Sequence, residues 1–145
     1  MELVDRRTKI RWIEVKDCLQ LLATKDVGRI GFVLGGAPEI LPVNYVLDGE
    51  AVVFATAEGS KLLGLARGPV VFEVDDTDAA SHTGWSVVVH GMADEVTAFD
   101  STTVQGRVRA LPIEPWSAGD KPHLVRISPT SISGRAVGPT AANLG

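Results

Sequence analysis

The sequence predicts a mainly β protein in which six antiparallel strands close into a small barrel, with two or three short helices at the strand ends. Between residues 27 and 96 apolar positions alternate with polar ones, and β-branched and aromatic residues are abundant, as is typical of strands. Gly35-Gly36 and Asp48-Gly49 suit the tight turns of antiparallel hairpins. Closing the sheet removes the exposed edges of an open one, and an open sandwich is the alternative arrangement.

Size and composition indicate one domain. The chain has 145 residues, of which 45% are hydrophobic and 22% are charged, so it is too apolar for a disordered chain. A net charge of −4 disfavours nucleic acid and anionic membranes as partners. A single cysteine, Cys18, cannot form an internal disulfide, and the first residues contain no apolar run of signal-peptide length. We therefore expect a cytoplasmic protein.

Two segments follow the period of an amphipathic helix. In residues 14–24, Val15, Cys18, Leu19 and Leu22 have the i, i+3, i+4, i+7 spacing of a buried stripe, so Cys18 is expected in the core. A second helix is predicted between residues 97 and 111, where three apolar residues recur at i, i+4 and i+7. A further short helix is expected in the segment after residue 58.

The strands expected early in the chain form a meander. Several segments are apolar on both faces, so one face of the sheet needs a cover other than the barrel interior, and a partner subunit is the simplest cover. The last part of the chain, from residue 131, is rich in small residues and is expected to be partly disordered. The predicted strands are 27–34, 38–47, 51–56, 69–75, 84–96 and 123–128.

Common catalytic motifs fail when they are checked by position. The segment 84–88 has valine where a nucleophile elbow needs its closing glycine, so no serine hydrolase is indicated. The order Ser60-Lys61 is the reverse of that in a Walker A loop. His82, His90 and His123 lack the spacing of metal ligands, so no metal site is expected.

One segment has the parts of a phosphate-monoester site. Residues 56–61 lie where a strand is expected to end and a short helix to begin, so main-chain N–H groups are available for an anion. Gly59 allows close backbone approach, Ser60 adds a hydroxyl donor, and Lys61 supplies a positive charge. The alternative is that Ser60 caps the helix and Lys61 is a solvated surface residue.

The order of these segments resembles the pyridoxamine 5′-phosphate oxidase-like, flavin-binding split-barrel family, in particular its short actinobacterial members. The resemblance spans about residues 15–128, leaving an N-terminal arm (1–14) and a flexible C-terminal tail (129–145). It implies a Greek-key split β-barrel that forms a homodimer, with two equivalent FMN sites between the subunits. The segments that carry it are VGRIGFV, LPVNYVLDGEAVVFATAEGSKL, GPVVFEVDD and TGWSVVVHGMADEV.

The resemblance also implies a set of cofactor-binding residues. From the residues alone, Val43 and Phe54 could equally be core, Asn44 could satisfy backbone groups, and Tyr45 and Trp85 could be interface aromatics. In the family's pattern, Ser60 and Lys61 would hold the FMN phosphate. Pro42, Val43, Asn44 and Tyr45 would lie along the isoalloxazine and ribityl chain, Phe54 and Thr56 would line the adjoining strand, and Trp85 would reach the site from the second subunit.

The expected function is that of an FMN-dependent oxidoreductase acting on an unidentified small molecule, and no catalytic residue is named. The chain lacks the basic and aromatic cluster and the C-terminal ending of the true oxidase, which disfavours pyridoxamine phosphate as substrate. An F420-dependent reductase is one alternative, for which Arg67 or Lys121 could hold the charged tail. Another alternative is a flavin- or haem-binding protein without turnover, because His90 or His123 could serve as a haem ligand.

Overall fold

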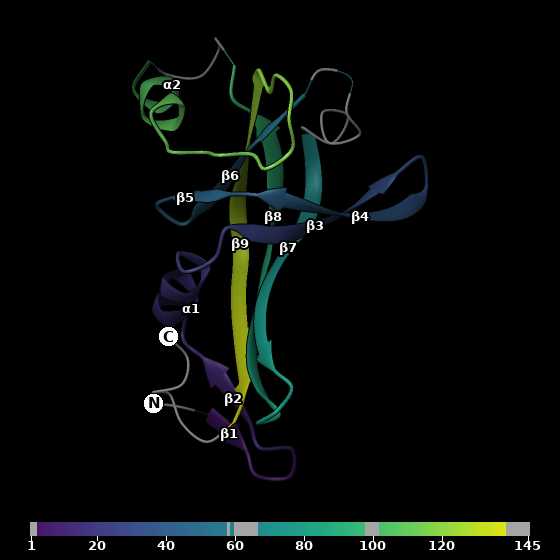
Figure 1. Ribbon diagram of the computed structural model, residues 1–145, viewed down its shortest axis with the longest axis vertical. Coiled ribbons are helices and arrows are strands. Elements are labelled where there is room, and N and C mark those ends of the chain that lie inside the picture. The colour runs from purple at the N-terminus through teal and green to yellow at the C-terminus, as the bar shows by residue number, and fades with distance from the viewer. Residues whose placement is uncertain (1–2, 58, 60–66, 98–101, 139–145) are drawn as a thin grey trace.

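The structure, a computed structural model, describes residues 3–57, 59, 67–97 and 102–138. Its strands form one antiparallel sheet that curls on itself, and β7, β8 and β9 run along most of the molecule (Figure 1). The helix predicted after residue 58 lies outside the described residues. In chain order the elements are β1 (Leu3–Asp5), β2 (Ile10–Ile13), α1 (Val15–Leu22), β3 (Val27–Leu34), β4 (Ala37–Asn44), β5 (Val46–Asp48), β6 (Ala51–Thr56), β7 (Arg67–Asp78), β8 (Thr83–Glu95), α2 (Thr102–Arg109) and β9 (His123–Val137).

The sheet is a split barrel. One continuous hydrogen-bonded path runs through β4, β3, β7, β8, β9 and β6 in that order. Its two ends, β4 and β6, contact each other, but no ladder joins them in the part of the chain that the structure describes. β5 extends the sheet beside β6, and the β1–β2 hairpin extends it beside the last residues of β9. The barrel is therefore open between β4 and β6.

Glycines form both predicted hairpin turns. Gly35 and Gly36 join β3 to β4 with φ of 60° and 81°, values that L side chains rarely adopt and that match a type I′ turn. Gly49, with φ of 61°, turns the chain between β5 and β6. The predicted meander is present as two consecutive hairpins, β3–β4 and β5–β6. The strand predicted to run through both is interrupted at Tyr45, and β6 pairs with β9 on its other side.

The main core fills the barrel, and α1 covers part of it. Cys18 and Leu22 are fully buried, as predicted. Val15 is half-exposed instead of buried, because the second half of α1 makes the contact with the sheet and Leu21 completes the buried face. A Cβ at Gly134 of β9 would lie 2.6 Å from the Cys18 sulfur, so the helix approaches β9 as closely as a glycine permits.

A second, smaller core lies on the other side of β6. Val53 and Val108 are fully buried there, which confirms the predicted helix in the range 97–111 as α2. The buried Asp48 carboxylate accepts two hydrogen bonds from Arg107 of α2, at 2.6 and 3.0 Å, and one from Arg126 of β9 at 3.0 Å. Among the described residues, no helix is long and apolar enough to cross a membrane.

The strand prediction is incomplete in three places, and the described residues contain nine strands where six were predicted. The predicted strand 38–47 is interrupted at Tyr45 and forms β4 and β5. The N-terminal arm contains β1 and β2, and β2 pairs with β9. β9 continues to Val137, so much of the segment predicted as a flexible tail is strand, held by β8 on one side and by β2 on the other.

Candidate functional site

The segment 42–45 has two sides. Val43 and Tyr45 are buried in the main core, whereas Pro42 is exposed and Asn44 is partly exposed on the opposite side. This alternation follows from the pleat of a strand, in which successive side chains point to opposite faces. A ligand on the outer side of β4 could therefore contact the side chains of Pro42 and Asn44, but only the main chain of Val43 and Tyr45.

Tyr45 is fixed inside the barrel. Its hydroxyl donates a hydrogen bond to the carbonyl oxygen of Leu22 at the end of α1. Its ring lies edge-on to that of Phe72, with centroids 5.0 Å apart and an interplanar angle of 75°. Burial raises the pKa of Tyr45, which leaves the phenol neutral at ordinary pH.

Asn44 connects β4 to the loop between α2 and β9. Its Oδ1 accepts a hydrogen bond of 2.8 Å from the main-chain N–H of Trp116. Its Nδ2 donates a bond of 3.4 Å to the carbonyl oxygen of Asp26. The amide thus satisfies two main-chain groups, as the alternative reading of this residue anticipated, and holds the loop 110–122 beside the outer side of β4.

The end of β6 also has two sides. Phe54 is only 1% exposed and belongs to the main core, and Thr56 is buried at the end of the same side. Ala55 points the other way, into a hollow beneath the loop 110–122. The predicted phosphate-binding residues Ser60 and Lys61 follow this strand but lie outside the described residues.

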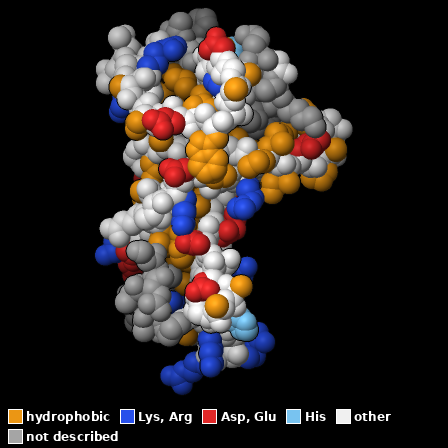
Figure 2. Space-filling model, in the orientation of Figure 1, with side chains coloured by type: hydrophobic (Ala, Val, Ile, Leu, Met, Phe, Trp, Pro, Cys, Tyr) orange, Lys and Arg blue, Asp and Glu red, His pale blue; other side chains and the backbone are white. Residues whose placement is uncertain are grey.

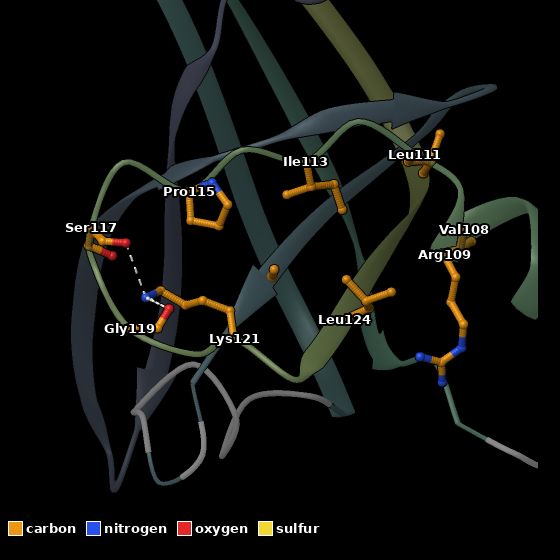
Figure 3. Close-up of a pocket in the computed structure, with 10 residues that line it drawn as sticks. Val108, Arg109, Leu111, Ile113, Pro115, Ser117, Gly119, Lys121 and Leu124 are labelled. Carbon is orange, nitrogen blue, oxygen red and sulfur yellow. Dashed lines mark hydrogen bonds between the residues drawn. The ribbon is translucent and has the colours of Figure 1, made fainter.

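The hollow beside Ala55 has a volume of about 340 Å³, within the usual range for small-molecule sites (Figure 3). Its walls are mainly apolar, and Arg109 and Lys121 add two cations. Lys121 folds back so that its Nζ donates to the carbonyl oxygens of Ser117, Ala118 and Gly119. The lining residues are Ala55, Val108, Arg109, Leu111, Ile113, Pro115, Ser117, Gly119, Lys121 and Leu124.

Trp85 lies far from these residues within one chain. It is almost fully buried near the start of β8, and it is ten residues from Glu95 at the end of that strand, roughly 30 Å along the backbone. It borders a different hollow of about 470 Å³ on the outer face of the sheet, together with Glu73, Asp75 and Arg135. One chain alone does not bring Trp85 to the end of β6.

The histidines named for haem have different surroundings. His123, next to Thr56 across the β6–β9 ladder, contacts the carboxylate of Glu95 through Nδ1. His90 is exposed on the outer face of β8. The side chains around the hollow include no carboxylate and no imidazole, so its described lining offers no obvious acid–base group.

The outer face of the sheet carries exposed apolar side chains near the β3–β4 hairpin. Val33 and Ile40 are each 66% exposed, and Pro38 and Val71 are also exposed. Ile40 and Val71 both pair with Gly31, which has no side chain to separate them. We call these four residues the outer apolar patch, and Figure 2 shows hydrophobic side chains gathered over this hairpin.

Glu73 and Asp75 are two acidic groups on this outer face. They lie two residues apart on the same side of β7, and the Arg29 guanidinium is 3.3 Å from Glu73 and 3.6 Å from Asp75. Burial, followed by the neighbouring Asp75, raises the pKa of Glu73 to about 7, because both favour the neutral acid.

The sequence prediction missed Ala55 and the loop 110–122. Strict alternation along β6 was a usable signal for Ala55, because a residue between two inward-facing neighbours must face outward. No local pattern indicated that the loop returns to β4, since its anchor is a contact between Asn44 and Trp116 that are 72 positions apart.

Comparison with known proteins agrees with this architecture. An FAD binding protein from Mycobacterium smegmatis has a TM-score of 0.76 and 35% identity, covering 89% of this chain and 99% of that one. A conserved protein of unknown function from Corynebacterium diphtheriae has a TM-score of 0.73 and 34% identity, covering 89% and 98%. An uncharacterized protein from Mycobacterium tuberculosis is 34% identical over 124 residues, which is 81% of this chain and 79% of that protein.

The match to a described family covers most of the chain. Residues 14–136 match the family described as pyridoxamine 5'-phosphate oxidase. This range includes both helices, the hollow, every predicted cofactor-binding residue and all six strands of the barrel path except the last residue of β9. The chain therefore belongs to the pyridoxamine 5'-phosphate oxidase family.

Proposed function

We propose that this protein is a flavin-binding oxidoreductase that holds FMN beside the outer side of β4 and the end of β6 and acts on an unidentified small molecule. The observation that carries the proposal is the meeting of three segments: the outward side of 42–45, the end of β6, and the hollow beneath the loop 110–122. The 35% identity to an FAD binding protein supports a flavin over other ligands.

The residues present fit a flavin in chemical type. A flat heterocycle needs apolar walls, and Leu111, Ile113 and Leu124 line the hollow. A phosphate tail needs cations. Arg109 lines the hollow, and Lys61 follows β6 in the sequence, whereas the Lys121 ammonium group already donates to three carbonyl oxygens. Bound flavin would supply the electron transfer, and the protein would orient the reactants and shield them from water.

The predicted residues take specific parts in this proposal. Ser60 and Lys61 hold the phosphate, and the outward side chains of Pro42 and Asn44 lie along the ring system and ribityl chain. Val43, Tyr45, Phe54 and Thr56 support that surface from within the barrel and meet the cofactor through main-chain atoms. Trp85 comes from the second subunit, because within one chain it lies at the other end of β8.

The proposal includes a homodimer. The outer apolar patch is exposed in one chain, and covering it would remove apolar surface from water. We expect sedimentation to give twice the mass of the chain, and we expect Ile40→Lys to shift the protein toward the monomer. Val15→Lys, on half-exposed α1, is the matched control and should remain dimeric. A wild-type monomer at micromolar concentration would exclude the dimer.

The central experiment is a titration of the purified protein with FMN, FAD, F420 and haem, each followed by its own absorbance band. We expect FMN to bind, and Lys61→Ala to weaken its binding by about 1–3 kcal/mol, the range for a lost charge-assisted hydrogen bond. Lys16→Ala, an exposed lysine on α1, should leave the affinity unchanged. A wild-type protein that binds neither FMN nor FAD would contradict the proposal.

A second candidate function is a flavin carrier or sensor without turnover. The described lining of the hollow favours it in one respect, because it contains no carboxylate or imidazole for proton transfer. Reduced flavin on the protein should then reoxidise no faster with a panel of electron acceptors than with dioxygen alone. Faster reoxidation with any one acceptor class would favour the oxidoreductase and identify that class.

A further inference from the structure

We propose that the indole of Trp116 forms one wall of the flavin site and lies against the cofactor ring beside the outer side of β4. The inference rests on the proposed function and adds a residue that the family resemblance did not supply. It is drawn from the placement of Trp116 in the loop 110–122.

Trp116 is exposed to a degree that is unusual for its size. Its 74% exposure is the highest among the large apolar side chains of the described residues. Within that part of the chain its indole makes no hydrogen bond and no ring contact, and only its main-chain N–H is engaged. A tryptophan has a large apolar surface, so leaving it in water forgoes a substantial stabilisation.

The loop that carries Trp116 is held in place from two directions. Asn44 accepts the Trp116 N–H itself, which fixes the backbone at this residue next to β4. Lys121 closes the other part of the loop by donating to three successive carbonyl oxygens, those of residues 117–119. An aromatic ring on an anchored loop loses little backbone freedom when it binds a ligand.

The neighbours of Trp116 point to a planar ligand. Pro115 and Ser117, on either side of it, line the hollow, while Asn44 and Pro42 continue the same outer side of β4. Trp116 therefore lies between the two surfaces that the proposed function assigns to the flavin. Stacking of the indole on a flat ring would cover both apolar faces.

The test compares wild-type protein with Trp116→Ala and Trp116→Phe in FMN titrations that follow flavin emission. Loss of an aromatic contact should raise the Kd of Trp116→Ala about tenfold. Trp116→Phe should keep the affinity within about threefold, because it retains a ring. Because a stacked indole quenches flavin emission and a phenyl ring does not, FMN bound to Trp116→Phe should be brighter than FMN bound to wild-type protein.

A control and the contrary outcomes separate this inference from the proposed function. Glu114→Gln, an exposed change on the same loop outside the hollow, should leave both affinity and emission unchanged. If wild-type protein binds FMN and Trp116→Ala binds it equally well, the Trp116 inference is wrong while the proposed function stands. If Trp116→Ala binds FMN equally well but is monomeric, the indole belongs to the interface between the two subunits instead. If wild-type protein binds no flavin, both fail.

Discussion

The inner and outer sides of the same two strand segments differ in what holds them. On the inner side of 42–45 and 54–56, Tyr45 and Phe54 are packed in the barrel, and their contacts lie within one chain. On the outer side, Pro42 and Asn44 face solvent, a loop and the outer apolar patch. In the same segments, therefore, the inward side chains stabilise the barrel, whereas the outward side chains are available to contact a ligand.

The largest expected effect is on the inner side. Phe54→Ala should lower the free energy of unfolding by about 3–5 kcal/mol, because it leaves a cavity in a fully buried site. Urea unfolding measures this, and Val15→Ala, at an exposed position of α1 outside the outer apolar patch, should change the free energy by less than about 0.5 kcal/mol. A small loss of stability with a large loss of flavin affinity would place Phe54 at the ligand instead.

A smaller loss of stability is expected from breaking the ion pairs of Asp48, which connect α2 to the barrel. Asp48→Asn should cost about 2 kcal/mol, below the usual range for a broken buried ion pair, because Arg107 and Arg126 are partly exposed. The Arg107 hydrogen bond holds the pKa of Asp48 below its usual value of 3.8, so the wild type keeps this stability above that pH and loses it as pH falls through the lowered pKa. Thermal unfolding from pH 2 to 7 should show this loss in wild-type protein and not in Asp48→Asn.

The Glu73 carboxyl, a partly buried acidic group on the outer face, is expected to make the stability of the protein depend on pH. Its pKa of about 7 lies above the ordinary value of 4.5, so the folded state binds the proton more tightly and wild-type stability should fall between pH 4.5 and about 7. Glu73→Gln should remove that fall and be more stable than wild type by about 1 kcal/mol above pH 7, since Arg29 offsets part of the burial cost. Equal pH dependence of both proteins would mean that Glu73 ionises normally.

The smallest expected effect is that of removing the Tyr45 hydroxyl, which lies on the inner side of the strand segment. Tyr45→Phe should cost about 1 kcal/mol in unfolding free energy, because it removes the hydrogen bond from the hydroxyl to the Leu22 carbonyl inside the barrel. FMN affinity should not change, since that hydroxyl faces away from the outer side. A loss of affinity in a variant of unchanged stability would show that Tyr45 contacts the ligand directly.

Local patterns predicted most of the elements. The bounds of β3 and β6 agree with the predicted segments 27–34 and 51–56, because alternation and glycine turns are encoded within a few residues. The β1–β2 hairpin and the second half of β9 were missed, since their short or small-residue segments become strands through pairing with one another. The break at Tyr45 arises where the chain crosses the split of the barrel.

The sequence predicted which segments form the candidate site, but not which of their side chains face it. The sequence indicated that 42–45 and 54–56 belong together, and β4 and β6 do flank the same split. It left open whether Val43 and Phe54 are core residues, and the structure buries both in the main core. It did not indicate that Ala55 points to the hollow, although alternation carried that information. It could not indicate the loop 110–122, because the Asn44–Trp116 contact depends on where two distant segments meet.

The sequence by itself determined the family, the mainly β class and the positions of the hairpins, because motifs and periodicity are properties of neighbouring residues. The tertiary structure decided which strands meet across the split, which side chains face outward, and which loop covers the hollow. These depend on the closure of the sheet, which brings together residues that no local pattern links.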